Sequence, residues 1–363
     1  AWPTTLLFYH QFLEWLGGLG IIILAISIMP LLGVGGMQLY RLEISGPMQD
    51  KRLAPRIVRS AEVMWLIYVG LTVLCFLAYY FSGLSAFEAL GESLSTVSTG
   101  GFSLHDQSIA YYHNAKMESF ATVFMILGAT KFGLHYVTLQ MRSLDSYFKD
   151  IEWVTMIRII FYVWLMMVTL LLFWNVYADI WVIFGKAGFT VVSMLTTTGF
   201  RNVDFSMWPS VLPIVIMLLP FMGGCAGSTT GGIKMMRFML LQQDAHRALW
   251  QLSHPNAVLS IKFGEQQVSE TIIQSMRGFI ALFIMLFIVL FLLVMATGIS
   301  FEDSFAAMVG CLTNVGASIA SLRNHYGILP DTTKMLLIFA MLAGRLEIMT
   351  LMVLFLPSFW KRF

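Results

Sequence analysis

Three short polar turns that contain glycine recur along the chain, each directly after a moderately apolar segment. They read TGGFS at 99–103, TTTGFRN at 196–202 and TNVGAS at 313–318. Glycine permits the positive φ that such turns often need, and it places no Cβ beside the backbone. Backbone carbonyls displayed by such turns can replace the hydration shell of an ion the size of K⁺. The turns therefore indicate coordination of a monovalent cation.

Aligning Gly100, Gly199 and Gly316 places the three turns in one register, with hydroxyl and amide side chains beside each glycine. A capping role alone is the alternative interpretation, because glycine is common just after the last residue of a helix. The residues expected to coordinate the ion are Ser98, Thr99 and Gly100, then Thr197, Thr198 and Gly199, and finally Asn314, Val315 and Gly316.

The elements that must position these turns are membrane helices. Hydrophobic residues make up 58% of the 363 residues and charged residues only 12%, whereas soluble domains have about 25% charged residues. Apolar segments long enough to cross a bilayer recur along the whole chain. The predicted spans are 7–29, 62–81, 120–140, 156–174, a broken one at 211–241, 280–296 and 335–356. The predicted fold class is an all-α integral membrane protein.

Charge placement orients these spans. Most of the 22 Lys and Arg residues fall in segments 38–61, 141–158 and 234–277 and at the C-terminus, which the positive-inside rule assigns to the cytoplasm. The apolar segments that precede the polar turns lie on the opposite side and are too short to cross. They read FEALGESLSTVS, DIWVIFGKAGFTVVSML and FEDSFAAMVGCL. Such segments are typical of re-entrant half-helices that line a water-filled path.

The order span, half-helix, polar turn, span therefore repeats along the chain. The chain starts with a single span that has no half-helix before it, so the first repeat is expected to be incomplete. The predicted division is 1–36 for the closing span of repeat 1, 61–141 for repeat 2, 156–250 for repeat 3 and 276–363 for repeat 4, joined by cytoplasmic linkers at 37–60, 142–155 and 251–275.

The broken third inner span contains GGCAGSTTGGIK at residues 223–234, hereafter the glycine loop. Glycines let the chain leave the helix, and hydroxyl side chains can satisfy the freed backbone groups. A phosphate-binding loop is excluded by one position, because Ile233 stands where that motif requires lysine. Close packing of small residues is the remaining alternative. The residues of interest are Gly223, Gly224, Gly227, Ser228, Thr229, Thr230, Gly231, Gly232 and Lys234.

These motifs, in this order and together with GRLEI at 344–348, resemble the Trk/Ktr/HKT superfamily of potassium transporters, and most closely its bacterial TrkH/KtrB branch. The resemblance implies four membrane–pore–membrane repeats around a pseudo-fourfold pore. Each repeat would supply one filter strand centred on a glycine, with K⁺ as the transported ion and no bound cofactor. The glycine loop would be the gate, and Arg345 a cationic barrier beside it. The first filter strand is absent here, so either the sequence is incomplete or the chain cannot conduct as written.

The same resemblance implies a location in the bacterial inner membrane, among membrane lipids, and a homodimer. It also implies a cytosolic nucleotide-binding regulatory subunit of the TrkA/KtrA type, and no nucleic-acid partner. The rival functions are a secondary transporter of another solute, which also uses broken helices, and a non-conducting assembly subunit. An enzyme is not expected, because no nucleophile–base or metal constellation is present.

Four charged residues, Glu14, Lys131, Arg345 and Glu347, lie within apolar stretches. Charges inside a membrane are costly and usually face the protein interior or a water-filled cavity. We expect Glu14 or Glu347 to pair with one of the two bases, since an unpaired cation would oppose cation permeation. Structural ion pairs between helices are the alternative.

Overall fold

The structure, a computed structural model, is almost entirely helical and describes residues 3–28, 53–209, 211–255, 259–264, 266–316, 326–346, 348–355 and 357–360. Within these residues the only strands are the two-residue β1 (Lys262–Phe263) and β2 (Gln266–Gln267), which pair antiparallel. The predicted all-α membrane fold is confirmed. The remaining short elements are η1 (Ser108–Tyr112), α7 (Asp145–Lys149), η2 (Phe205–Met207), η4 (Tyr326–Ile328) and α16 (Pro357–Trp360).

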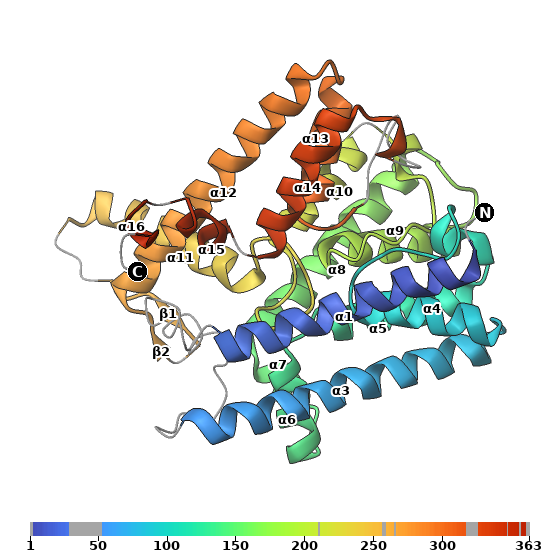
Figure 1. The fold of residues 1–363 in the computed structure, drawn as a ribbon, viewed down its shortest axis with the longest axis horizontal. Helices are drawn as coiled ribbons and strands as arrows, with labels where there is room; N and C mark the ends of the chain where they lie inside the picture. The colour runs from blue at the N-terminus through green and yellow to red at the C-terminus, as the bar shows by residue number, and fades with distance from the viewer. Residues whose placement is uncertain are drawn as a thin grey trace.

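Four long helices form the frame: α1 (Thr4–Ile28), α3 (Leu53–Phe81), α8 (Ile151–Phe173) and α12 (Glu270–Ala296). Figure 1 shows α1 and α3 running side by side, with α12 on the far side of the molecule. Large apolar side chains such as Leu66, Phe161 and Leu292 are 61%, 51% and 57% exposed. Exposed apolar surface of this extent is expected where lipid is the solvent.

Three half-helices pack against this frame: α4 (Ala86–Val97), α9 (Ile180–Leu195) and α13 (Phe301–Leu312). Each begins at a capping side chain, since Ser85, Asp179 and Ser300 accept hydrogen bonds from backbone N–H groups of the first turn. Such caps satisfy donors that a helix N-terminus otherwise leaves without partners. The C-terminal half of each half-helix is buried, which places the polar turns inside the protein.

The inner spans differ from the prediction, because the inner span of repeat 2 is broken as well as that of repeat 3. The predicted span 120–140 is α5 (Ala115–Gly128) followed by α6 (Phe132–Met141), with a bend of 96° between them. The third inner span breaks as expected between α10 (Val211–Met222), which carries Pro220, and α11 (Met235–Ser253). The fourth consists of α14 (Asp331–Arg345) and α15 (Ile348–Val353).

Tertiary hydrogen bonds explain the unexpected bend after α5. The carbonyl of Ala129 accepts from Cys225 N–H (2.9 Å), and Phe132 N–H donates to the carbonyl of Gly227 (3.2 Å). The glycine loop thus satisfies backbone groups that a continuous helix would satisfy internally. The prediction of a single broken inner span was wrong because these bonds join residues almost a hundred positions apart.

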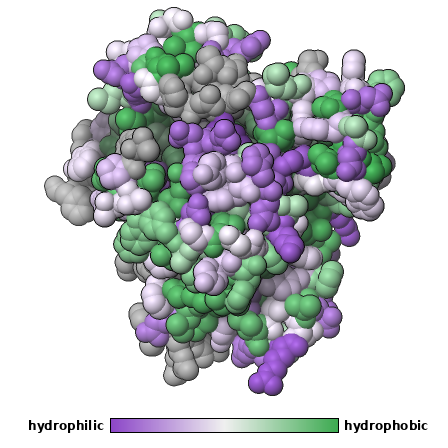
Figure 2. All heavy atoms as spheres, turned by 90° about the vertical axis from the view of Figure 1, so that its right-hand side faces the viewer, coloured by the Kyte–Doolittle hydropathy of each residue, from purple (hydrophilic) through white to green (hydrophobic). Residues whose placement is uncertain are grey.

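Polar and apolar surfaces separate on the face that carries the N-terminal end of α1. On this face, shown in Figure 2, hydrophilic residues gather near the centre and hydrophobic residues lie below and beside them. That distribution is the one expected when a polar mouth is surrounded by membrane-facing sides.

Candidate ion pathway and gate

The three polar turns have the same backbone conformation. Each half-helix ends at a C-cap residue, Ser98, Thr196 or Thr313, in a near-helical conformation. The next residue takes a positive φ that is uncommon for a residue with a side chain. The residue two positions later is a glycine, also with positive φ. The φ values are 52° at Thr99, 55° at Thr197 and 58° at Asn314, then 86° at Gly101, 79° at Gly199 and 69° at Gly316.

This conformation corrects the register predicted for repeat 2. The N–H group of Gly100 donates to the carbonyl five residues earlier, as do those of Thr198 and Val315 in the other repeats. Gly101, rather than Gly100, is therefore equivalent to Gly199 and Gly316. The alignment on Gly100 was wrong by one residue because the sequence offers two adjacent glycines and does not show which one takes the positive φ. The equivalent segments are 99–101, 197–199 and 314–316.

The turns of repeats 2 and 3 lie in direct contact. A Cβ atom on Gly101 would lie only 1.6 Å from the carbonyl oxygen of Thr198, and one on Gly100 would overlap the carboxyl group of Glu14. Backbone therefore approaches backbone at a distance that only glycine allows.

The glycine loop lies against all three half-helix ends. Thr229 Oγ1 lies 3.0 Å from Thr99 Oγ1, and it is 3.3 Å from the Val97 carbonyl, which places it at the end of α4. The N–H of Gly231 donates to Thr197 Oγ1 (2.7 Å) at the end of α9. A Cβ on Gly231 would lie 2.2 Å from the carbonyl oxygen of Thr313 at the end of α13. One short loop thus joins three repeats at a single point.

Hydroxyl side chains satisfy backbone groups within the loop, as expected from the sequence. Ser228 Oγ donates to the Cys225 carbonyl (2.6 Å), and Thr230 Oγ1 accepts from Gly224 N–H (3.2 Å). The glycines also allow close packing, since a Cβ on Gly232 would lie 2.4 Å from the Pro220 carbonyl oxygen. Close packing and an irregular backbone therefore occur together in this loop.

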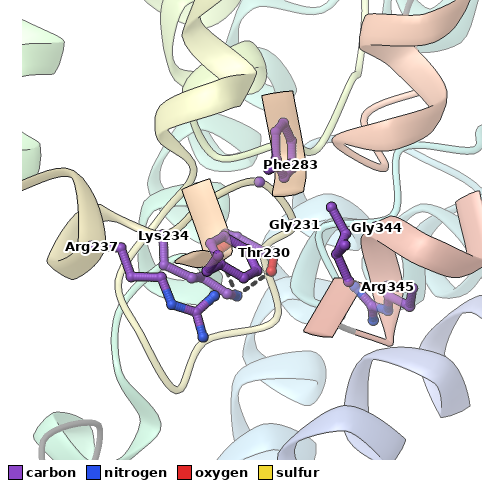
Figure 3. Close-up of a pocket in the computed structure, with 10 residues that line it drawn as sticks. Thr230, Gly231, Lys234, Arg237, Phe283, Gly344 and Arg345 are labelled. Atoms are coloured by element: carbon purple, nitrogen blue, oxygen red, sulfur yellow. Dashed lines mark hydrogen bonds between the residues drawn. The ribbon is translucent and has the colours of Figure 1, made fainter. Parts of the chain in front are cut away.

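Arg345 holds the loop from the end of α14. Its Nη1 donates to the carbonyl of Thr229 (3.1 Å) and its Nη2 to the carbonyl of Gly17 on α1 (3.0 Å). Figure 3 shows Arg345 on one side of a pocket next to the loop, with Lys234 on the other side donating to the carbonyl of Thr230. Two cationic side chains therefore flank the loop directly beside the three turns.

The prediction paired Glu14 or Glu347 with one of the two bases, and Lys131 has other partners. Its Nζ lies 2.8 Å from Asp150 Oδ2 and 2.8 Å from Glu152 Oε2, not beside Glu14. Glu14 instead accepts a hydrogen bond from Phe102 N–H (3.2 Å), next to the turn of repeat 2. Glu347 lies outside the described residues. The alternative of a structural ion pair between helices applies to Lys131, which contacts two carboxylates.

Two acidic residues near the site were missed by the sequence analysis. Glu92, fully buried in α4, accepts from Ser103 Oγ (2.5 Å), Leu104 N–H (3.0 Å) and Tyr112 Oη (3.1 Å), and so shapes the segment after the first turn. Glu152, fully buried at the start of α8, contacts the glycine loop. For Glu92 the available signal was a carboxylate within a moderately apolar half-helix. Glu152 follows Lys149 and Asp150 in the predicted linker 142–155, so its sequence context gave no such signal.

A second charged cluster joins α11 to α12 outside the predicted spans. Arg277 donates to both carboxylate oxygens of Asp244 (2.6 and 2.7 Å), and Arg247 adds a third bond (2.9 Å). Hydrogen bonds from Arg277 hold the pKa of Asp244 below its usual range. The cluster therefore ties the helix that follows the glycine loop to the base of the next span.

Replacing Asp244 with asparagine should lower stability by about 1–3 kcal/mol at pH 7, since hydrogen bonds to a charged group are lost. A carboxylate with a lowered folded pKa stabilises above its unfolded pKa of about 3.9, and this stability disappears as the pH falls through the folded value. Thermal unfolding in detergent should show a lower midpoint at pH 7 and a smaller difference below about pH 4. The control is Asp331→Asn, because the Asp331–Lys334 pair is exposed. Equal midpoints for the wild type and Asp244→Asn at pH 7 would contradict the expectation.

The chain is similar to known cation transport proteins in both sequence and structure. The sequence model of the family described as "TrkH: Cation transport protein" matches residues 1–362. The chain is 43% identical to the Trk system potassium uptake protein TrkH of Escherichia coli K12 over 359 residues, which cover 99% of this chain and 74% of that protein. It is also 43% identical to the protein of the same name from Halomonas elongata, with the same coverage.

The crystal structure of the potassium transporter TrkH from Vibrio parahaemolyticus has the same fold. It superposes with a TM-score of 0.90 at 37% sequence identity, covering 99% of this chain and 74% of that one. The resemblance inferred from the motifs is confirmed.

Proposed function

Because the chain belongs to the TrkH family of cation transport proteins, we propose that it carries K⁺ across a membrane through a filter of backbone carbonyls. The filter strands are 99–101, 197–199 and 314–316, and the glycine loop is the gate. The supporting observation is the identical conformation of three turns that meet one loop. The family is one of transporters, so no enzymatic activity or cofactor is implied.

Carbonyl coordination explains why the turns follow half-helices. The dipole of each half-helix places partial negative charge at its C-terminal end. In the proposed filter, the backbone carbonyls of these turns replace water around a bare cation. Backbone carbonyls, rather than carboxylates, suit a monovalent ion that must leave as readily as it enters. Among the described residues no cluster of His, Cys, Asp and Glu suggests a fixed metal site.

The contacts of the glycine loop suit a reversible gate. Thr229 and Gly231 reach the half-helix ends through neutral hydroxyl and backbone groups. A hydrogen bond of this kind contributes only about 1 kcal/mol net. A few such bonds can hold the loop in the pathway and still exchange with water when it retracts, as a two-state gate requires.

Location and partners follow from the family. We propose the bacterial inner membrane, a homodimer, and a cytosolic nucleotide-binding regulatory subunit that docks on the cytoplasmic side. The basis is the resemblance to the Trk/Ktr/HKT superfamily, whereas the relatives named "Trk system potassium uptake protein" support potassium uptake alone. Membrane lipid is the natural partner of the exposed apolar side chains of the long helices.

A secondary transporter of another solute is disfavoured by the repeats. Such proteins typically place paired broken helices in inverted halves. Here the inner spans of repeats 2 and 3 both break, and each break follows a half-helix and turn in the same chain order. Repeats in the same orientation favour an arrangement in which equivalent repeats surround one ion path.

Uptake of ⁸⁶Rb⁺ into proteoliposomes of the full-length protein tests the proposal. Uptake should exceed that of protein-free liposomes and should fall when unlabelled K⁺ competes outside. Uptake equal to that of protein-free liposomes, from folded and reconstituted protein, would favour the non-conducting assembly subunit instead.

A further inference from the structure

We propose that Glu152 is the positioning residue that latches the glycine loop in place, with Lys131 as the counter-ion that allows a carboxylate to be buried there. The inference rests on the gate role proposed above. Glu152 lies in the first turn of α8, the outer span of repeat 3, and would keep the loop in its observed position.

Glu152 binds the loop near both of its ends. Its Oε1 accepts from the N–H of Ala226, near the start of the loop, at 2.6 Å. The same oxygen accepts from the N–H of Met236, in the first turn of α11, at 3.2 Å. Ala226 and Met236 are themselves buried, and Glu152 is completely inaccessible. One carboxylate therefore closes the base of the loop by joining the two points where the chain leaves and re-enters helix.

Lys131 balances the charge of this carboxylate. Its Nζ lies 2.8 Å from Glu152 Oε2, the oxygen that does not accept from Ala226 or Met236, and 2.8 Å from Asp150 Oδ2. Lys131 lies at the bend between α5 and α6, and its neighbours Ala129 and Phe132 bond to the loop through their backbones. The bend, the loop and the start of α8 thus form one assembly with the Lys131–Glu152 pair at its centre.

The chemistry of Glu152 makes this contact stronger than the neutral contacts that hold the loop. Hydrogen bonds from N–H groups to an ionised acceptor are shorter and about twice as strong as neutral ones. Retraction of the loop would leave a buried carboxylate without these donors, which is costly. The neutral contacts of Thr229 and Gly231 carry no such penalty. Glu152 therefore joins Arg345 as a charged group that holds the loop from another helix, and its two bonds lie near both ends of the loop.

Asp150 is the natural control. It forms the same ion pair with Lys131, but its Oδ1 accepts from Glu152 N–H and Trp153 N–H at the start of α8, and none of its bonds reaches the loop. Asparagine can keep this capping role. Asp150→Asn therefore removes one carboxylate partner of Lys131 and keeps both hydrogen bonds between Glu152 and the loop segment.

The test uses the full-length protein with Cys75 and Cys311 replaced by alanine, so that among the three cysteines of this chain only Cys225, buried in the loop, can react. Variants Glu152→Gln, Glu152→Asp and Asp150→Asn are compared for the rate of Cys225 modification by a methanethiosulfonate reagent and for ⁸⁶Rb⁺ flux. Glu152→Asp keeps the charge that pairs with Lys131, but its side chain is one methylene too short to reach the loop. It replaces Glu152→Gln in the labelling test if that variant does not fold.

Glu152→Gln and Glu152→Asp should label Cys225 about tenfold faster than the wild type and raise flux, because loop retraction costs less. Asp150→Asn should label at the wild-type rate. Wild-type labelling rates in monodisperse Glu152 variants would overturn the latch, and so would equal acceleration by Asp150→Asn. Labelling does not depend on transport, so absence of Rb⁺ flux in the wild type would count against the proposed function and not against the latch.

Discussion

Replacing Arg345 with alanine should raise K⁺ flux about tenfold or more. The side chain donates to the carbonyls of Thr229 on the glycine loop and Gly17 on α1, so its removal releases the loop from α14. Hydrogen bonds from a charged donor contribute about 1.5–3 kcal/mol each, and 1.4 kcal/mol corresponds to a tenfold change. Removal of a positive charge from beside a cation path lowers the electrostatic barrier as well. Rb⁺ uptake into proteoliposomes measures the result.

The variant Arg345→Lys separates these two effects. Lysine keeps the charge, but it lacks the planar fork that reaches both the Thr229 carbonyl on the glycine loop and the Gly17 carbonyl on α1. If charge is the main barrier, flux in Arg345→Lys should stay near the wild-type value, and if the tether dominates, flux should rise as in the alanine variant. Unchanged or lower flux in well-folded Arg345→Ala protein would refute the barrier role of Arg345.

Replacing Gly101 with alanine should abolish K⁺ transport. A Cβ at this position would lie 1.6 Å from the carbonyl oxygen of Thr198, a group of the neighbouring strand, and the φ of 86° is strained for any L residue. Relief of the overlap must displace one strand or both, so the carbonyls would no longer match the size of the ion. We expect Rb⁺ uptake to fall to the level of protein-free liposomes.

The matched control is Gly185→Ala. Gly185 lies in α9, the half-helix of repeat 3, and a Cβ there meets no atom within 4 Å. Alanine also favours helix more than glycine does, by about 1 kcal/mol, so transport should be unaffected. Normal Rb⁺ uptake by Gly101→Ala protein would show that this strand does not contact the ion.

Hydropathy and residue type were sufficient to predict the architecture of the chain. The long helices α3, α8 and α12 and the half-helices α4, α9 and α13 lie close to the predicted segments. Both kinds of element depend on how many consecutive residues are apolar, which the sequence displays directly. The break at residues 223–234 was also predictable, because five glycines within twelve residues disfavour a helix in any context.

The bend after α5 and the register of the repeat 2 turn were mispredicted for different physical reasons. The bend at 129–131 has few helix-breaking residues and depends on backbone bonds from Cys225 and Gly227. Tertiary context overrides local propensity in this case. The choice of Gly101 over Gly100 depends instead on the residue at which α4 ends, because Gly100 N–H donates to the Ser95 carbonyl.

The sequence by itself determined that this is a membrane protein of repeated helical hairpins with glycine turns and one broken span, since transfer into lipid and backbone freedom are local properties of residues. Only the tertiary structure decided which charges meet. Lys131 pairs with Asp150 and Glu152 rather than Glu14, because ion pairing depends on which helix ends come together in space. The same packing brings Glu152 to the glycine loop.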